Sequence, residues 1–247
     1  MRKSIKLLAL VVGTLLLFSS YGNIRVKAAS LNNGIFEEKV VSEKIQLYSR
    51  MPVVDTNELM HMAKFGVDEL CRDTGIEWNA EITASDLCCD VSTYCTSQLI
   101  GEYMYDNELF KEYALTSLAV SDVKQYGYAP VSGQGCTLRT TMVVTWNASG
   151  NRATLNYQAT WVTGGNPTVL VMENKVDKGL DTGKSYVNSN QILGPNGTYT
   201  LLTPSSEEVG DSYGSELWCR GTVYFQGGSS IVSSVILDPG GIVPPEI

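Results

Sequence analysis

The stretch TLRTTMVVTWNASGNRATLNYQATW, residues 137 to 161, decides the fold class of the C-terminal half of the chain. It contains two runs in which apolar residues recur at every second position, which is the period of a β-strand. The segment NASGN between the runs is rich in residues that favour turns. The stretch therefore predicts a β-hairpin. The apolar residues expected on its buried side are Leu138, Met142, Val144 and Trp146 in the first run and Ala153, Leu155, Tyr157, Ala159 and Trp161 in the second.

The same period continues toward the C-terminus. Further runs that resemble strands are TVLVME, TYTLLT, ELWCRGTVYFQ and SIVSSVIL, with Gly-, Asn- and Pro-rich turns between them. Short alternating strands at this density predict an antiparallel β-sandwich or a partly open barrel over residues 126–238. Residues 239–247 are expected to form a flexible tail.

The N-terminal half, residues 29–125, has a different pattern that predicts helices. In DTNELMHMAKFGVDELCRDTG, residues 55 to 75, Asp55 can cap a helix start and Glu58 can reach back to it. Apolar residues then recur at three- and four-residue steps, which places them on one side of a helix. Gly75 stands where that helix would end.

A second helix is predicted from Ser85, a good N-cap, to residue 103, and it can continue or restart through NELFKEYALTSL. Its apolar side would consist of Leu87, Val91, Cys95, Leu99 and Tyr103, which recur every four residues. The Gly-, Pro- and Ser-rich stretch QYGYAPVSGQG, residues 125 to 135, is typical of a linker. The predicted fold class is therefore α+β, with a helical N-terminal region of residues 29–125 followed by the β domain.

The first 28 residues are typical of a secretory signal peptide. Arg2 and Lys3 give a positive start, the apolar run from Leu7 to Phe18 follows, and small residues near Ala28 suit cleavage after it. A membrane-spanning helix needs about 20 apolar residues, and no second long apolar run occurs. We therefore predict a secreted, extracellular protein with no membrane span after cleavage.

The chain is acidic, with 26 acidic residues against 18 basic ones and a net charge of −8. Five of the basic residues and none of the acids lie in the signal peptide, so cleavage would leave 13 bases against 26 acids. Such a surface repels phosphate backbones and anionic lipids. Nucleic acid is therefore excluded as a predicted partner.

Six cysteines follow the signal peptide, and export would permit disulfides. Cys136 and Cys219 are both expected to face the core, and a bridge between them would stabilise the fold by about 4 kcal/mol. Cys88 and Cys89 are too far from Cys95 along a single helix to pair with it. Three possibilities remain: the helix breaks near Cys89, some of these cysteines bridge to the strand region, or some cysteines stay reduced as small apolar residues. The candidate pairs are Cys136 with Cys219 and Cys71 with Cys95.

No metal, redox or cofactor site is predicted. Structural zinc ligands usually come in pairs two to four residues apart. Cys71, Cys88, Cys89 and Cys95 are instead separated by 16, zero and 5 residues. No CxxC motif occurs, so a thiol redox centre has no basis in the sequence.

His61 is the only histidine, and a Ser-His-Asp or Cys-His enzyme would depend on it. Nothing near it resembles a nucleophile motif, and a place on a helix surface is ordinary for such a residue. The other acid–base candidates are the carboxylates Glu207, Glu208 and Asp211 and the pair Glu77 and Glu81. Clusters of this kind are usually solvated, so no catalytic residue is assigned and a secreted hydrolase is the alternative hypothesis.

The aromatic residues of the strand region give the best indication of binding. Trp218, Arg220 and Tyr224 lie on the side of their predicted strand opposite Cys219 and Val223. An exposed aromatic sheet face is typical of a surface that binds sugar or protein, although the helical region could also cover it. We predict a non-enzymatic extracellular protein whose β domain binds a protein or glycan partner.

Overall fold

The computed structural model describes residues 43–85, 90–122, 133–149, 151–178, 184–192, 196–202, 208–210 and 215–239, without the side chains of 184–192 and 196–202. Apart from residue 43, these stretches belong to one compact unit, Lys44–Ile247. The expected signal peptide and residues 240–247 of the expected tail lie outside the described residues.

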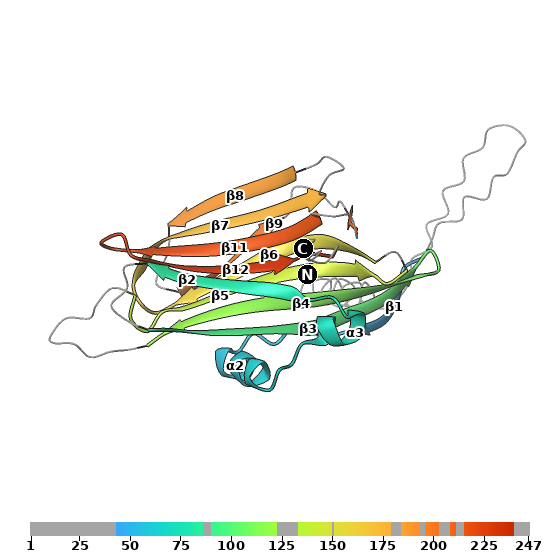
Figure 1. The fold of residues 1–247 in the computed structure, drawn as a ribbon, viewed down its shortest axis with the longest axis horizontal. Helices are drawn as coiled ribbons and strands as arrows, with labels where there is room; N and C mark the ends of the chain where they lie inside the picture. Colours follow the sequence, from blue (N-terminus) through green and yellow to red (C-terminus); the bar gives the residue numbers. More distant parts are fainter. Residues whose placement is uncertain are drawn as a thin grey trace, which may run out of the picture. The chain divides into compact units, whose positions relative to one another are not determined.

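Two antiparallel β-sheets stacked face to face form this unit (Figure 1). Sheet A contains, in spatial order, β1 (Ile45–Ser49), β3 (Val91–Tyr105), β4 (Glu108–Ser121), β5 (Thr137–Asn147), β6 (Arg152–Thr163) and β10 (Glu208–Val209), and β9 (Asn196–Leu202) also pairs with β6. Sheet B contains β2 (Trp78–Ser85), β12 (Ser230–Leu237), β11 (Ser215–Phe225), β7 (Pro167–Lys178) and β8 (Lys184–Ile192). Two short helices, α2 (Thr56–Lys64) and α3 (Glu69–Thr74), follow β1.

The apolar core lies between the two sheets. β11 shows this most clearly, because Leu217, Cys219 and Val223 are fully buried while Trp218 and Arg220 are only partly buried. This alternation is what a sheet with one covered and one open face produces. The hairpin expected at residues 137 to 161 is present as β5 and β6, and the β-rich fold is compatible with the expected sandwich.

A band of polar side chains divides the core into two apolar clusters. Ser233 of sheet B donates to the Ser117 hydroxyl of sheet A at 2.9 Å, and Gln158 Nε2 donates to the backbone carbonyl of Arg220 at 2.8 Å. Gly221 lies beside this band, and a Cβ there would come within 2.7 Å of a threonine hydroxyl of β5. The missing side chain therefore allows a close approach of the two sheets.

The expectation of a helical N-terminal region over residues 29–125 is wrong, and with it the α+β fold class, because the described part of this region is mainly antiparallel β-sheet. Of the expected second helix, the residues from Val91 to Tyr103 lie in β3, and Glu108 to Leu118 of the stretch NELFKEYALTSL lie in β4. Side chains four residues apart lie on the same face of a helix and also on the same face of a strand, where the period is two. The apolar spacing is therefore compatible with a helix and with a strand. Pairing with β1 and β4 on either side decides in favour of the strand.

The segment from Asp55 to Gly75 is helical, but it forms two short helices rather than one. The predicted cap is confirmed, because the Asp55 side chain accepts a hydrogen bond from the Glu58 N–H at 3.0 Å. The chain leaves α2 through Gly66, whose φ of 67° favours glycine. The predicted stop at Gly75 is also confirmed, with φ of 73°. Within the described residues, no helix is long and apolar enough to cross a lipid bilayer.

A bulge in sheet A changes which side chains of β6 face the core. The register of β5 against β6 shifts between Val143 and Val144, and an extra residue of this kind reverses the alternation beyond it. Leu155, on one side of the shift, is 1% exposed and lies in the core. Tyr157 and Trp161, on the other side, are partly exposed, so the expectation that they share the buried side is wrong.

Strands from both sides of the expected linker at residues 125 to 135 belong to the same sheets. In sheet A, β4 pairs with β5 along most of its length. In sheet B, β2 pairs with β12 along all eight of its residues. Each sheet therefore combines strands from the N-terminal and C-terminal parts of the sequence.

Candidate functional site

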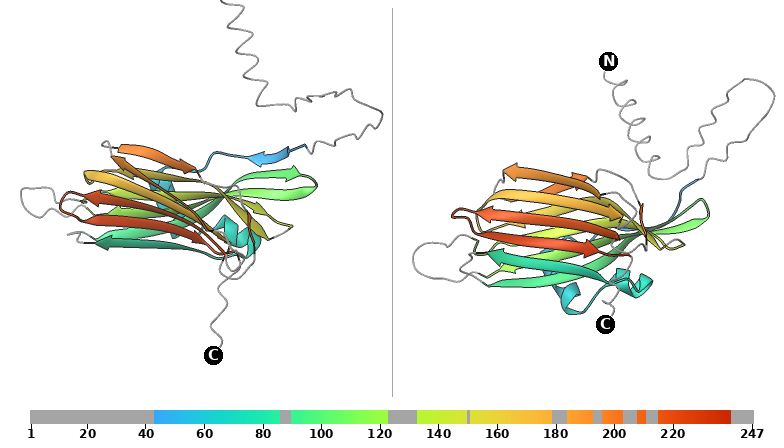
Figure 2. Two further views of the ribbon diagram at one scale, coloured as in Figure 1. Left: turned by 90° about the horizontal axis from the view of Figure 1, so that it is seen from above. Right: turned by 45° about the horizontal axis from the view of Figure 1, so that its top comes forward.

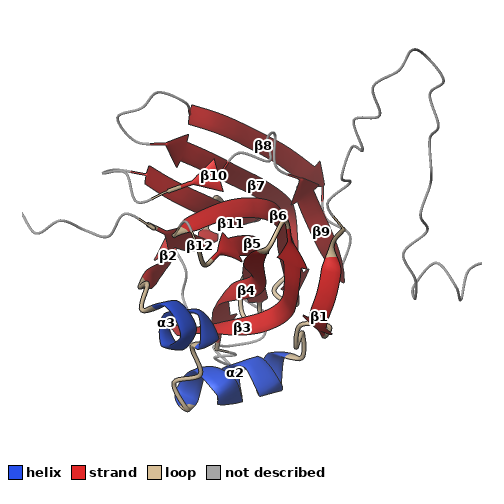
Figure 3. Cartoon of the chain, turned by 90° about the vertical axis from the view of Figure 1, so that its right-hand side faces the viewer, coloured by secondary structure: helices blue, strands red, loops and turns tan. Residues whose placement is uncertain are grey.

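No described helix covers the outer face of sheet B (Figure 3). Both helices pack against β3 of sheet A instead. The residues of β11 that alternate with its buried positions point to this open face. The structure thereby places the three predicted binding residues, Trp218, Arg220 and Tyr224, on one face of one strand.

Trp218 and Arg220 form a stacked pair on this face. The guanidinium carbon of Arg220 lies 4.4 Å from the centre of the Trp218 ring, a distance at which the ring attracts a cation. Arg220 Nε also donates to Glu173 Oε2 at 2.7 Å, and Glu173 is its register partner on β7. The stack and the ion pair together fix the orientation of the guanidinium group.

A second ion-pair cluster adjoins Trp218. The register partner of Trp218 on β7 is Lys175. The Nζ atom of Lys175 lies 3.0 Å from Asp177 Oδ2 and 3.5 Å from Glu216 Oε1. Burial acts to lower the pKa of Lys175, but the two carboxylates outweigh this effect and raise it. Lys175 is therefore charged at neutral pH, and its charge is balanced locally.

Tyr224 lies near the other end of β11. Its side chain is 42% exposed, and its register partners are Val169 on β7 and Ser230 on β12. At about 3.3 Å per residue, it lies roughly 20 Å along the strand from Trp218. The face therefore presents aromatic groups at two points along one strand.

His61 has none of the neighbours that a catalytic histidine requires. It is exposed on α2, and its ring lies against Phe65 with ring centres 4.4 Å apart. Within the described part of the chain, the structure gives it no hydrogen bond to a serine, a cysteine or a carboxylate. This environment is that of a surface histidine.

Among the described carboxylate candidates, Glu208 belongs to sheet A, whereas Glu81 belongs to sheet B and Glu77 precedes its strand. Glu208, on β10, forms an ion pair with Arg152 at 3.4 Å. Glu77 and Glu81 are both exposed, the first just before β2 and the second within it. The remaining candidates, Glu207 and Asp211, lie outside the described residues.

Neither candidate disulfide is formed. Cys136 and Cys219 face the core and are fully buried, but no disulfide joins them and they belong to different apolar clusters. Cys71 on α3 and Cys95 on β3 are free. Burial raises the pKa of the Cys219 thiol well above its ordinary range, which keeps it protonated and unreactive at neutral pH. Cys88 and Cys89 lie outside the described residues.

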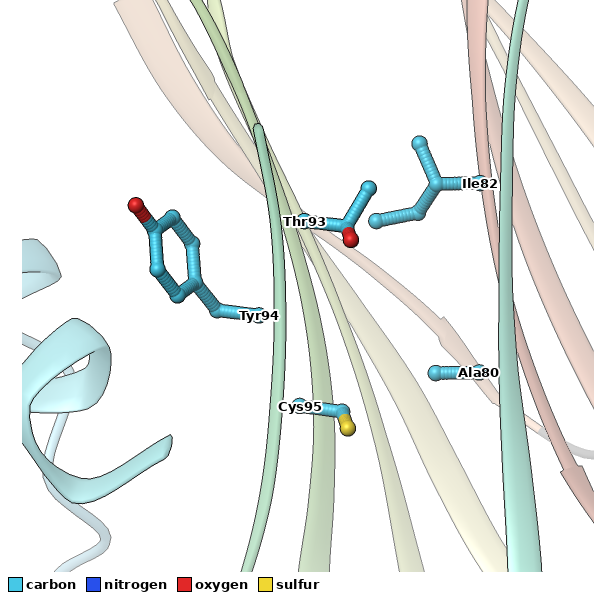
Figure 4. A pocket seen from close by; sticks show the side chains of 5 residues that line it. All are labelled: Ala80, Ile82, Thr93, Tyr94 and Cys95. Carbon is cyan, nitrogen blue, oxygen red and sulfur yellow. The ribbon is translucent and has the colours of Figure 1, made fainter. Parts of the chain in front are cut away.

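A small hollow lies between β2, an edge strand of sheet B, and β3 of sheet A (Figure 4). Thr93 and Cys95 of β3 point across it toward Ile82 and Ala80 of β2, whereas Tyr94 points away. Its volume is about 50 Å³, against roughly 300–1,000 Å³ for a small-molecule site. The hollow is therefore too small for an organic ligand. No cluster of three or more metal-ligating side chains occurs in the described ranges.

Asp68 fixes α3 on the sandwich, a role that the sequence pattern did not reveal. Its carboxylate caps the helix by accepting from the Cys71 N–H at 3.1 Å, and it also accepts from the Ser97 hydroxyl at 2.5 Å and from Trp78 Nε1 at 3.0 Å. One side chain thus joins α3, β2 and β3. An aspartate before a short helical pattern is the signal that could have indicated the cap.

Asp73, at the other end of α3, joins the helix to β4. It accepts from Arg72 Nε at 2.9 Å and from the Tyr113 hydroxyl at 3.1 Å, and Lys111 Nζ lies 3.5 Å away. Burial acts to raise the pKa of Asp73, but Arg72, Lys111 and Tyr113 outweigh it and lower the pKa. The pKa of Tyr113 is raised, first by burial and then by Asp73. These shifts hold Asp73 ionised and Tyr113 protonated, which suits an anchor rather than an acid–base pair.

Together these features describe two stacked antiparallel sheets, and the outer face of sheet B carries aromatic side chains and ion pairs. No protein-family model, no curated protein and no solved structure matches the chain.

Proposed function

We propose that this is an exported, non-enzymatic protein that binds an extracellular protein or glycan through the outer face of sheet B. The arrangement of Trp218, Arg220 and Glu173 supports the proposal most, because it holds an aromatic ring, a cation and a carboxylate together on an uncovered sheet. Tryptophan, tyrosine and arginine are the residues that contribute most often to binding energy at protein surfaces.

The chemistry of the face suits a neutral or mixed-charge partner. Trp218 and Tyr224 offer apolar surface with few rotatable bonds, so ordering them on binding costs little conformational entropy. Arg220 is already oriented by its ion pair with Glu173, and its remaining guanidinium donors can hydrogen-bond hydroxyl or carbonyl groups. No metal or cofactor is required for this kind of recognition.

The test uses the secreted protein on a panel of immobilised glycans and extracellular proteins. We expect at least one ligand to bind, and we expect Trp218→Ala to weaken that binding by about tenfold or more. Arg220→Lys keeps the charge but loses the planar stack, so it should also weaken binding.

Phe65→Ala is the matched control, because Phe65 is an exposed aromatic residue on α2 at 73% exposure. It should leave the affinity unchanged. The proposal fails if every ligand found binds the Trp218→Ala, Tyr224→Ala double variant as tightly as the parent.

A further inference from the structure

A second uncovered surface lies on the outer face of sheet A. One end of this face is covered by α2 and the segment before it, where Leu59 is 1% exposed and Arg139 donates to the backbone carbonyl of Val54. The other end adjoins the β3–β4 hairpin, which extends past the end of sheet B (Figure 2), and no described helix or strand covers it. We call this end the Glu112 surface, and it consists of Tyr103, Tyr105, Phe110, Glu112, Thr145, Asn156 and Tyr157.

Aromatic rings form an ordered platform on the Glu112 surface. Tyr103 and Phe110 are register partners on β3 and β4, and their rings stack with centres 5.2 Å apart and planes 10° apart. Tyr105 meets the Phe110 ring edge-on at 6.5 Å and is 46% exposed. These contacts hold the rings in place without a covering layer.

Glu112 is a partly buried carboxylate beside this platform. A Cβ on Gly101 would lie 2.7 Å from Glu112 Oε2, so the glycine leaves the room that the carboxylate occupies. The neighbouring Lys111 pairs with Asp73 and Glu102, and within the described ranges no basic side chain forms a salt bridge with Glu112. Among the described residues, the Glu112 carboxylate therefore has room for a cationic partner from outside the chain.

Two tyrosines lie close enough to Glu112 to sense this charge. The pKa values of Tyr103 and Tyr157 are both raised, mainly by burial and further by the Glu112 carboxylate. Thr145 and Asn156 complete the surface with a side-chain hydrogen bond of 2.9 Å. The surface therefore combines aromatic faces, a free carboxylate and fixed polar groups.

An ammonium group already occupies part of the surface. Lys44 Nζ lies 3.5 Å from the centre of the Tyr103 ring, which is the geometry of a cation–π contact. Glu112 would add a direct ion pair for a second ammonium group placed beside the Tyr157 ring. The net charge of −8 adds a long-range attraction for cationic partners.

We infer that the Glu112 surface binds a lysine side chain of a basic segment in a protein partner. The ammonium group pairs with Glu112 and lies against the Tyr157 ring, because Phe110 and Lys44 already lie against the two faces of Tyr103. This site is separate from the proposed site on sheet B, so either can fail without the other.

The test titrates the full-length secreted chain with a capped tetralysine peptide and with the same peptide after acetylation of every side-chain amine. We expect the charged peptide to bind, more weakly at high salt, and the acetylated peptide not to bind. Glu112→Gln should weaken binding by about fivefold. Tyr157→Leu removes a ring without changing the charge and should weaken binding by about twofold to fivefold.

Two variants serve as controls, with the melting temperature showing that each is folded. Glu58→Gln removes one charge from exposed α2 and should leave the affinity unchanged, as should Trp218→Ala on sheet B. The inference is overturned if Glu112→Gln and Glu58→Gln weaken binding equally, since attraction would then be nonspecific. It is also overturned if the acetylated peptide or a neutral oligosaccharide binds as tightly as tetralysine, or if Trp218→Ala abolishes the binding.

Discussion

At the scale of single residues, ion pairs distinguish the acidic side chains that stabilise the fold from those that are available to a ligand. Glu112 is a residue of β4, and Asp73 contacts β4 from α3. Asp73 has three partners and a lowered pKa, so its charge is used within the fold. Glu112 has no salt bridge in the described part of the chain, although it is partly buried. Partial burial of an unpaired charge costs free energy, which a cationic ligand would offset.

The Asp73 carboxylate should stabilise the fold only while it is ionised. Because its folded-state pKa lies below the ordinary value of 3.8, its contribution is present above the unfolded-state pKa and is lost as the pH falls through the folded-state pKa. We expect Asp73→Asn to lower the free energy of unfolding at pH 7 by about 1 kcal/mol. Urea unfolding at neutral pH and below about pH 3 measures the difference, which should shrink in acid.

Glu77→Gln is the control for this prediction, because Glu77 is an exposed carboxylate for which the described residues provide no ion pair. It should change the free energy of unfolding by less than about 0.5 kcal/mol at either pH. An Asp73→Asn penalty of equal size at both pH values would contradict the ionic role and indicate a purely steric one.

At the scale of elements, the two helix caps differ in what they connect. Asp55 caps α2 with one hydrogen bond to the Glu58 N–H. Asp68 caps α3 and in addition accepts from Ser97 and Trp78 of the sandwich. Loss of Asp68 therefore leaves partly buried donors without a partner, whereas loss of Asp55 affects only the helix end.

We expect Asp55→Ala to destabilise the protein by about 1 kcal/mol and Asp68→Ala by about 2–4 kcal/mol, because two further hydrogen bonds to a charged acceptor are lost. Thermal and urea unfolding of the two variants, measured side by side, provide the comparison. Asp55→Ala is itself the matched control for the loss of a cap. Equal penalties would mean that α3 is held by its apolar contacts and not by Asp68.

Element type could be predicted from the sequence where local chemistry decides it. The cap at Asp55, the stop at Gly75 and the hairpin at residues 137 to 161 are local signals. β3 was mistaken for a helix because its four-residue spacing suits both structures, and only pairing with distant strands decides between them. The bulge at Val143 could not be predicted either, because it depends on how two strands pair.

The two candidate sites also differ in how far the sequence could predict them. Trp218, Arg220 and Tyr224 lie on one strand without a register shift between them, so alternation alone placed them on one face. The Glu112 surface combines residues of β3, β4, β5 and β6. Its members are brought together only by the order of strands in the sheet, which the sequence pattern did not supply.

At the scale of the whole molecule, the sandwich interleaves the two halves of the sequence. β3 and β4 precede residues 125 to 135 and extend sheet A beyond β5. β2 precedes them as well and forms one edge of sheet B. Removing these strands would expose one edge of β5, one edge of β12 and much of the inner face of sheet B.

The fragment of residues 126–247 should therefore not fold by itself, in contrast to what the expected division after residue 125 would allow. Its only cysteines are Cys136 and Cys219, which are fully buried in the complete chain. We expect both thiols of the fragment to react with iodoacetamide as fast as in denaturant, because their burial depends on the lost strands.

In the folded full-length chain, peptide mapping after the same treatment should show both thiols protected. The full-length chain in guanidinium chloride gives the rate for exposed thiols. If the fragment protected both thiols, the second half of the sequence would be a self-sufficient domain, and residues 29–125 could be removed from it. If it protected only Cys219, sheet B would keep its inner face without β2, and the stability of the sandwich would reside in β7, β11 and β12.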